Sequence, residues 1–320
     1  MARLVSLGSA SKDVFLIDRD DFAEVEIDGK SFFSHLELGQ KVDIDRVAFS
    51  TGGGATNAAV TFARFGHEST IISNIGNDSE GENVLKDLKK ENVNTDFINI
   101  AKNRKTGYST ILLTPRGERT ILTFRGASAH LQDLSPDCLA EFSHDWLYAT
   151  TLRGDFATLE TFFKKTKSFG GKVMFNPGKA ELADKHAFIR LMHHMDALLL
   201  NKTEAQSIVH GETLTELLEN LKKLTTIIII TDGPMGAIAH DGEKTFRIGL
   251  YEDVRVRDAT GAGDAFGSGF LAAYASGETF KKSLHFAAAN STSVVTKIGA
   301  KAGILTGKEK LHPMLIQEIK

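Results

Sequence analysis

The stretch DATGAGDAFGSGF at residues 258–270 combines backbone groups that can hold an anion with a side chain that can take a proton. If the following helix begins near Gly261, the amides of Gly261, Ala262 and Gly263 have no partner inside the helix. Small residues let an anion approach these amides, and the positive end of the helix dipole favours its charge. Asp264 then lies in the first turn, where its carboxylate can accept a proton from a group beside the anion. A capped, closely packed helix explains part of the pattern and stays open, but anion binding explains more of it.

A second glycine cluster, STGGGATNAAVTFARFG at residues 50–66, follows the same logic. Gly53 and Gly54 lead into a helix, and Asn57 lies in its first turn. The side-chain amide of Asn57 can both donate and accept hydrogen bonds, which suits a sugar hydroxyl. An asparagine that only satisfies its own helix end fits equally well, so the residues alone leave both roles open.

A sheet must position these two helices, and the chain contains the apolar runs that predict one. The runs do not alternate with polar residues, which is typical of strands covered on both faces. Helical intervals separate them, so the sequence predicts an α/β fold: a doubly wound, mostly parallel sheet with helices on both faces. The runs lie at residues 3–8, 69–76, 145–151, 172–178, 197–204 and 226–233.

Polar residues stand where these runs end. In an open parallel sheet, ligands bind beyond the carboxyl ends of the strands. A polar residue at such a place is also ordinary turn chemistry, but several of them from different strands favour a site. The residues are Asp13, Asn176, Asn201, Glu204, Thr231 and Asp232.

Two regions break the rhythm of the predicted sheet. Residues 15–49 are rich in Asp, Glu and Phe with alternating pieces such as AEVEID, and residues 106–124 predict a hairpin that turns at 115–118. Together they predict a small β-sheet beside the main body. Because no linker is evident, we expect a single domain over residues 1–320, with a lid formed by about 15–49 and a contribution from about 106–124.

Composition points to small-molecule chemistry. The 38 Lys and Arg residues against 41 Asp and Glu residues give a net charge of −3. Neither sign forms a run typical of a nucleic-acid or membrane partner. A single cysteine, Cys138, excludes an internal disulfide and favours a reducing compartment. No apolar stretch is long enough to span a bilayer, so the expectation is a soluble, cytoplasmic protein.

The motifs, taken in order, resemble the ribokinase-like family of carbohydrate kinases, also called the PfkB family. DATGAGDAF is similar to the C-terminal signature of that family, and GGGATNAAVTFARFG is similar to its N-terminal signature. The resemblance spans nearly the whole chain. Further matches are GSASKD at 8–13, TGY at 106–108, GERTIL at 117–122, NKTE at 201–204, TDGPMG at 231–236 and SVVTKIGAKAG at 293–303.

The resemblance implies a role for each matched residue. Asp264 would be the catalytic base, and the amides of Gly261, Ala262 and Gly263 would stabilise the transferring phosphoryl group. The acceptor would be bound by Asp13, Gly53, Gly54, Asn57 and Phe15. The nucleotide would be bound by Asn201, Thr231, Gly233, Gly236 and Asn290. Glu204 would hold Mg²⁺ through water, and Asp258 with Thr260 would hold an activating K⁺, whose requirement the sequence leaves open. Two departures are Ala259, where Thr is common, and RGAS at 125–128, which puts one substrate contact in doubt.

The implied activity is an ATP-dependent kinase that transfers the γ-phosphoryl group to a hydroxymethyl group of a small sugar. A nucleoside kinase of the same fold is the first alternative, because phenylalanines in the lid region can stack on a base. A phosphosugar kinase and a non-catalytic sugar or nucleotide sensor also stay open. We further expect a homodimer formed through the lid, since an uncovered sheet edge invites pairing. The phenylalanines are Phe15, Phe22, Phe32, Phe33 and Phe49, and the cations considered for a second phosphate are Lys41, Arg125 and Arg153.

Overall fold

The computed structural model describes residues 1–17, 24–27, 30–33, 38–39, 41–114, 116–141, 144–251 and 254–319. Phe22 and the residue at position 115 of the predicted hairpin turn lie outside the described residues, and so do the side chains of Phe32 and Phe33. Within the described part of the chain, no helix is long and apolar enough to cross a membrane.

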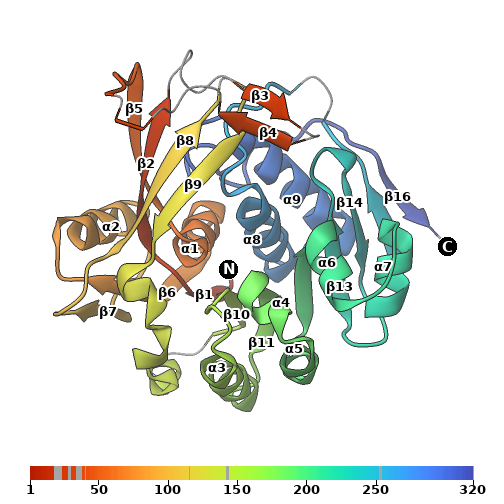
Figure 1. Cartoon of the computed structure of the whole chain (residues 1–320). Helices are drawn as coiled ribbons and strands as arrows, with labels where there is room; N and C mark the ends of the chain where they lie inside the picture. The colour runs from red at the N-terminus through yellow and green to blue at the C-terminus, as the bar shows by residue number, and fades with distance from the viewer. Residues whose placement is uncertain are drawn as a thin grey trace.

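Ten strands form the main sheet, in the order β16-β15-β14-β13-β12-β11-β10-β1-β6-β7 (Figure 1). Seven of them run parallel: β1 (Arg3–Leu7), β6 (Glu68–Gly76), β7 (Ile98–Ala101), β10 (Trp146–Thr150), β11 (Lys172–Asn176), β12 (Ala197–Asn201) and β13 (Ile227–Thr231). Three antiparallel strands extend one edge: β14 (Ala237–His240), β15 (Thr245–Ile248) and β16 (Ile316–Ile319). The predicted mostly parallel sheet is confirmed.

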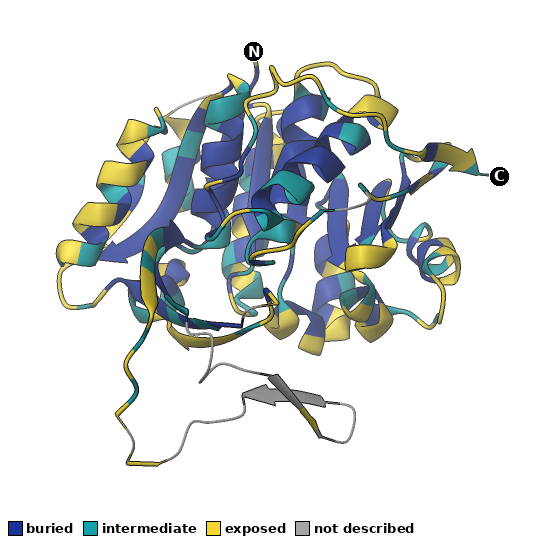
Figure 2. Cartoon of the chain, turned by 90° about the horizontal axis from the view of Figure 1, so that it is seen from above, coloured by how far each residue is buried: buried dark blue, intermediate teal, exposed yellow. Residues whose placement is uncertain are grey.

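Helices cover both faces of this sheet, which explains why its strands are apolar without alternation. On β12, Leu198 packs into the core that contains Phe188, whereas the next residue, Leu199, packs into the opposite core with Phe270. Figure 2 shows the buried strands between helices whose outer surfaces are exposed. The first face carries α3 (Phe156–Ser168), α5 (Lys185–Met192), α6 (Lys202–Ile208) and α7 (Leu214–Leu221); the second carries α1 (Gly54–Phe65), α8 (Ala262–Ala275) and α9 (Phe280–Val295).

The helix α2, the short helix α4 and several 3₁₀ turns complete the body. α2 (Ser79–Lys90) packs Val84 and Leu88 against Ile71 and Ile75 of β6. α4 (Lys179–Ala183) follows β11. Four 3₁₀ turns are η1 (Gly126–Ala129), η2 (Leu131–Asp133), η3 (Pro136–Ala140) and η4 (Gly233–Met235).

A separate small sheet, in the order β5-β2-β8-β9, rises beside α1 (Figure 1). Its strands are β2 (Ser11–Ile17), β5 (Arg46–Gly52), β8 (Gly107–Leu113) and β9 (Arg119–Phe124). β8 and β9 form the predicted antiparallel hairpin, whereas β2 and β8 pair in parallel. The predicted small sheet is confirmed, although it begins at Ser11 rather than near residue 15. β3 (Glu24–Ile27) and β4 (Lys30–Phe33) form an antiparallel pair of their own.

Glycine is required where the small sheet joins α1. A Cβ on Gly52 would lie 1.8 Å from Asp13 Oδ2, and a Cβ on Gly53 would lie 2.3 Å from the carbonyl oxygen of Ser9. Gly53 also has a φ of 98°, which a residue with a side chain rarely adopts. The glycine cluster therefore lets the chain pass directly beside Asp13.

Candidate active site

A cleft of about 670 Å³ lies between the small sheet and the carboxyl ends of the main-sheet strands. The small sheet contributes Asp13 and Ser109, and α1 contributes Asn57. The amino end of α8 contributes the segment from Gly261 to Asp264. The structure therefore brings together both glycine clusters and the polar ends of several strands, as the sequence predicts.

Asp264 lies in the first turn of α8, with its carboxylate held by two amides. Asn57 Nδ2 donates to Oδ2 at 2.8 Å, and Asn176 Nδ2 donates to Oδ1 at 3.4 Å. Burial raises the pKa of Asp264 above its ordinary value, while the Asn57 hydrogen bond and the charge of Lys301 oppose this rise. A carboxylate with a raised pKa that lines a cleft is suited to accept a proton.

The backbone before Asp264 has the geometry of an anion cradle. Gly261 caps α8 with a φ of 79°, and a Cβ there would lie 2.4 Å from Ala300 Cβ. Ala262 donates its amide to the carbonyl oxygen of Ala259 at 3.3 Å. Among the hydrogen bonds of the described residues, the amides of Gly261 and Gly263 donate to none, and a Cβ on Gly263 would meet open space. Two of the three predicted amides are thus free, whereas the amide of Ala262 is engaged in a turn.

The other glycines of α8 serve packing. A Cβ on Gly267 would lie 2.5 Å from Leu199 Cδ2 and from Tyr148 Oη, and one on Gly269 would approach Asn290. The two interpretations of the glycine-rich stretch therefore apply to different glycines. Those before Asp264 line the cleft, and those after it let α8 approach the sheet and α9.

Asp13 of the small sheet and Asn57 of α1 line one side of the cleft. Ser11 Oγ donates to Asp13 Oδ1 at 3.2 Å, and Ser109 also donates to this carboxylate. Burial raises the pKa of Asp13, while Lys301 is the main opposing influence. Asn57 Oδ1 is buried without a hydrogen-bond partner among the described residues. Because a buried acceptor without a partner is costly, this oxygen is placed to accept from a ligand hydroxyl.

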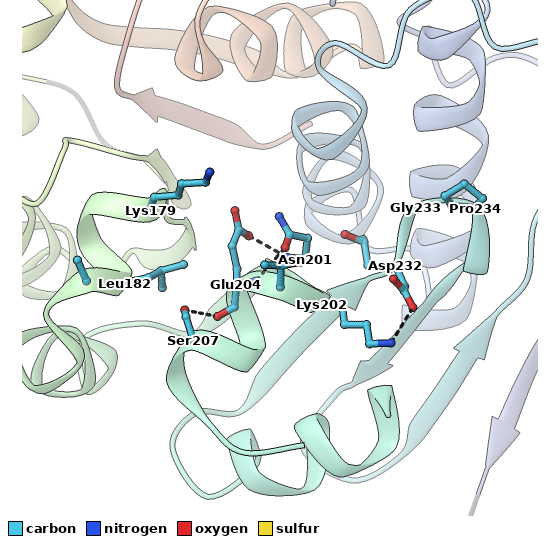
Figure 3. Close-up of a pocket in the computed structure, with 12 residues that line it drawn as sticks. Lys179, Leu182, Asn201, Lys202, Glu204, Ser207, Asp232, Gly233 and Pro234 are labelled. Carbon is cyan, nitrogen blue, oxygen red and sulfur yellow. Dashed lines mark hydrogen bonds and ion pairs between the residues drawn. The ribbon is translucent and has the colours of Figure 1, made fainter. Parts of the chain in front are cut away.

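A second cavity of about 720 Å³ lies next to the cleft, beside α6. Thr231 and Gly233 are among the residues that line it (Figure 3). Asn201 and Glu204 form a capping box on α6: Asn201 Oδ1 accepts from the Glu204 amide and Glu204 Oε2 accepts from the Asn201 amide, both at 2.9 Å. Burial raises the pKa of Glu204. N-x-x-E is a capping-box signature, so these two residues have a structural role as well as the predicted one.

Three predicted contacts are not supported by the arrangement. Asn290 is fully buried, with Nδ2 bonded to the Ala265 carbonyl oxygen at 2.8 Å and Oδ1 accepting from the Leu305 amide at 2.9 Å. It joins α8 to α9 instead of lining the second cavity. Phe15 is also fully buried and does not line the cleft. Gly236 packs against β15 and does not line the second cavity.

Asp258 is fully buried and is bound by backbone amides, from Thr260 at 2.9 Å and Gly299 at 2.9 Å. It thereby fixes the turn that leads into α8. Thr260 Oγ1 is buried with no partner among the described residues. This unpartnered oxygen next to a buried carboxylate is the type of donor set that a hard cation takes.

The structure adds three residues to the predicted site. Asn176, singled out only as a polar strand end, contacts Asp264 directly. Lys179 of α4 lines both cavities, and its side chain extends toward Glu204 in Figure 3. Lys301 approaches the cleft from the segment after α9. Most lysines lie on protein surfaces, and their spacing in the sequence does not mark the few that reach a site. Only the fold could therefore reveal Lys179 and Lys301.

Comparison with known proteins identifies the family. A model described as pfkB family carbohydrate kinase matches residues 16–306. A ribokinase from Haemophilus influenzae is 28% identical over 271 residues, covering 82% of this chain and 86% of that protein. An ATP-dependent 6-phosphofructokinase from Thermoanaerobacterium thermosaccharolyticum is 27% identical over 281 residues, covering 82% and 84%. In fold, the chain resembles an adenosine kinase from Sinorhizobium meliloti, with a TM-score of 0.80 at 20% identity over 96% of this chain and 97% of that one. The predicted family is confirmed: the chain belongs to the pfkB family of carbohydrate kinases and is a phosphotransferase that acts on a sugar hydroxyl.

Proposed function

We propose that this kinase transfers the γ-phosphoryl group of ATP to a hydroxymethyl group of a small sugar. The observation that carries the proposal is the position of Asp264, which Asn57 holds at 2.8 Å beside the free amides of Gly261 and Gly263 in one cleft. A base next to an anion cradle is the arrangement that phosphoryl transfer to a hydroxyl needs. A sugar or nucleotide sensor has no use for it.

In the proposed reaction, the acceptor hydroxyl lies between Asp264 and the phosphoryl group. As its oxygen bonds to the γ-phosphorus, the bond from phosphorus to the bridging oxygen breaks and ADP leaves. Asp264 takes the proton of the hydroxyl. The amides of Gly261 and Gly263 donate to the phosphoryl oxygens, while Asp13 and Asn57 hold other hydroxyls of the acceptor. Because the transition state is loose, positioning and charge stabilisation supply most of the rate.

The nucleotide is assigned to the cavity beside α6. Thr231 and Gly233 line it, and Lys179 provides a positive charge toward the phosphates. Among the described residues no group of three His, Cys, Asp or Glu side chains gathers to hold a metal ion. A single carboxylate, Glu204, with Oε1 outside the capping box, fits Mg²⁺ bound mainly by water and phosphate. Bound there, Mg²⁺ would neutralise charge on the phosphates.

An activating K⁺ is assigned to the turn before α8. The unpartnered Thr260 Oγ1 and the neighbouring buried Asp258 support this assignment. A cation there would stabilise the turn that presents the Gly261 amide. The test compares the rate of ADP release in K⁺ with the rate in a tetraalkylammonium salt at the same ionic strength. A higher rate in K⁺ is the expected result.

The small sheet is proposed to act as a lid. It provides one wall of the cleft, and it joins α1 through Gly52 and Gly53, the glycines that pass beside Asp13. Closure would exclude water, so that phosphate passes to the acceptor rather than to solvent.

Two other acceptor classes are each favoured by particular side chains. Ile121 and Phe124 of β9 line the cleft and could contact a base, which favours a nucleoside. Arg119 and Arg125 also line it, and Arg119 Nε is buried without a partner among the described residues, which favours a sugar phosphate. Lys41 and Arg153, also considered for that role, are exposed and do not line the cleft.

One panel separates these classes. Purified protein with Mg-ATP is offered pentoses, hexoses, sugar phosphates and nucleosides, and ADP release is measured for each. Turnover with an unphosphorylated sugar at the highest kcat/KM is the expected result. Turnover with nucleosides alone would replace the proposed acceptor, and no turnover with any compound would favour a sensor.

A homodimer through the small sheet is supported by apolar side chains on its edge strands. Val47 and Phe49 on β5 and Leu122 on β9 are each more than two fifths exposed. Exposed apolar groups clustered on one sheet mark a surface for association. Light scattering is expected to give twice the chain mass, and the Phe49→Glu variant is expected to shift toward a monomer. A monomeric wild-type protein would contradict this assembly.

A further inference from the structure

Lys301 carries a buried ammonium group that the reaction described above does not use. Only 8% of the residue is exposed. Its Nζ donates to the carbonyl oxygen of Thr51, and to Thr51 Oγ1 at 3.2 Å. Thr51 belongs to the end of β5, directly before the glycines that join the small sheet to α1. The ammonium therefore holds the small sheet where β5 ends and the chain enters α1.

The backbone of Lys301 is fixed as firmly as its side chain. Arg64 Nη1 donates to the carbonyl oxygens of Lys301 at 2.9 Å and Ile304 at 3.1 Å. The preceding residue, Ala300, packs so closely on Gly261 that a Cβ at Gly261 would lie 2.4 Å from Ala300 Cβ. The segment is thus in contact with the anion cradle at one residue and with the small sheet at the next.

The acidic groups around Lys301 explain how a buried ammonium is tolerated. Such a charge costs several kcal/mol unless opposite charges compensate it. The carboxylates that act on it are Asp13, Asp87, Asp264 and Glu91. Glu91 is already paired with Arg64 at 2.7 Å, and Asp87 lies on the exposed face of α2. Burial lowers the pKa of Lys301 to about 8, with Asp13 the strongest opposing influence, so the group is charged at neutral pH.

The two carboxylates in the cleft need such a charge. Asp13 is buried and Asp264 is half-buried. The charge of Asp13 raises the pKa of Asp264. Lys301 lowers the pKa of each. Asn57, by contrast, bonds only to Asp264. The remaining ionisable groups that act on or respond to this pair are Asp258, Glu204 and Tyr148.

We propose that Lys301 is a positioning residue of this kinase: its ammonium ties Thr51 of the small sheet to the segment that packs on Gly261, and its charge stabilises Asp13 and Asp264 as carboxylates on either side of the acceptor. The inference rests on the proposed role of Asp264 as base. Lys301 would then be an internal cation close to both the acceptor-binding carboxylate, Asp13, and the proton-accepting carboxylate, Asp264.

Three substitutions separate the charge from the tether. Lys301→Gln keeps a donor for Thr51 without the charge, Lys301→Met keeps neither, and Lys301→Arg keeps the charge. The pH profile of kcat/KM is expected to move its acid limb to higher pH by about one unit in the Gln and Met variants, so that activity below the limb falls about tenfold. Lys301→Arg is expected to retain the wild-type limb. The exposed Lys297 provides the control, since Lys297→Met is expected to leave the profile unchanged.

An acid limb that does not move in Lys301→Gln and Lys301→Met would overturn the proposal, because a purely structural lysine alters stability and not the profile. Unfolding gives a second test that needs no turnover. Lys301→Met removes the positive charge that acts on the buried Asp13, so the double variant Asp13→Asn/Lys301→Met is expected to melt at a higher temperature than Lys301→Met alone. If Lys301→Met does not fold, recovery of cooperative unfolding in the double variant supports this charge coupling, and failure to recover refutes it.

The two proposals fail in different ways. If the wild-type protein phosphorylates no acceptor, the proposed function fails, while the unfolding comparison still tests whether the charge of Lys301 stabilises Asp13. If the wild-type protein is active and the variants show neither the shifted limb nor the recovery of stability, only the role of Lys301 is refuted.

Discussion

Replacing Asp264 with asparagine removes the charge of the proposed base while keeping its shape. The amide oxygen in the variant can keep the 2.8 Å bond from Asn57. Its NH₂ group then faces Asn176 Nδ2, whose 3.4 Å contact with the carboxylate is weak from the start. We therefore expect a folded variant, with a melting temperature within about 3 °C of wild type.

The expected loss of activity follows from the role of a general base. A positioned base contributes about 10²- to 10⁴-fold to rate. Phosphoryl transfer has a loose transition state that needs proton removal late, which favours the lower part of that range. Turnover of Asp264→Asn should fall at least about a hundredfold, equivalent to about 2.7 kcal/mol in the barrier. Binding of ATP should be nearly unchanged, because Asp264 faces the acceptor side of the cradle.

The wild-type pH profile tests the same assignment. Burial raises the pKa of Asp264, against the hydrogen bond from Asn57 and the charge of Lys301. Only the ionised form accepts a proton, so kcat/KM should be constant above this raised pKa and fall as the pH drops through it. The residual activity of Asp264→Asn should lack this acid limb.

The assay couples ADP release to NADH oxidation, with the acceptor found in the panel, and calorimetry measures ATP affinity. Asp137→Asn is the control, because Asp137 is an exposed carboxylate in η3 that makes a surface ion pair with Lys165 and accepts a long hydrogen bond from Ser135, and none of these three residues lines the cleft. Turnover in Asp264→Asn within about tenfold of wild type, with the acid limb intact, would refute the base assignment.

Four further substitutions test the cradle, the metal carboxylate and the acceptor contact. Gly261→Ala should lower the melting temperature by at least about 3 °C, because its φ of 79° and the contact with Ala300 both oppose a side chain. Gly263→Ala, whose Cβ meets open space, should melt like wild type yet lose at least about tenfold in kcat, and normal kcat would argue against the cradle. Glu204→Gln keeps the capping box, so it should raise the Mg²⁺ concentration for half-maximal activity about tenfold without loss of stability. Glu216→Gln, in the capping box of α7, should change neither, and an equal effect of both would refute the metal role. Asn57→Ala should raise the acceptor KM more than the ATP KM, whereas equal changes would contradict a direct acceptor contact.

The sequence predicted the main sheet because its signal is local. The run from Ile227 to Ile230 is buried on both faces, and a short β-branched run without alternation is typical of a strand in a covered parallel sheet. The cradle was predictable for a similar reason, since its groups are consecutive in the chain. The hairpin of β8 and β9 was also predictable, because its alternation and turn residues lie within one segment.

Contacts between distant segments were not predictable from spacing. Asn290 lies 25 residues after Ala265 and 15 residues before Leu305, and only packing shows that both ends of its amide are already used. The resemblance implied that Phe15 contacts the acceptor, but the small sheet packs this ring completely inside the protein, and such packing depends on segments that the local sequence does not show.

The cleft divides its chemistry between two structural supports. Asp264 and the cradle are mounted on α8, which Gly267 packs directly against Leu199 of the main sheet, so the groups that act on phosphate share one rigid body. Most groups that we assign to the acceptor, such as Asp13 and the side chains of β9, are mounted on the small sheet, which joins that body through Gly52 and Gly53. Asn57 is the exception, because it lies on α1. We therefore expect a change of acceptor to require changes mainly in the small sheet, while the groups assigned to phosphoryl transfer stay as they are. This division explains why the motifs identify the reaction class, whereas the acceptor is proposed to depend on the individual side chains that line the cleft, such as Phe124 and Ile121 of β9.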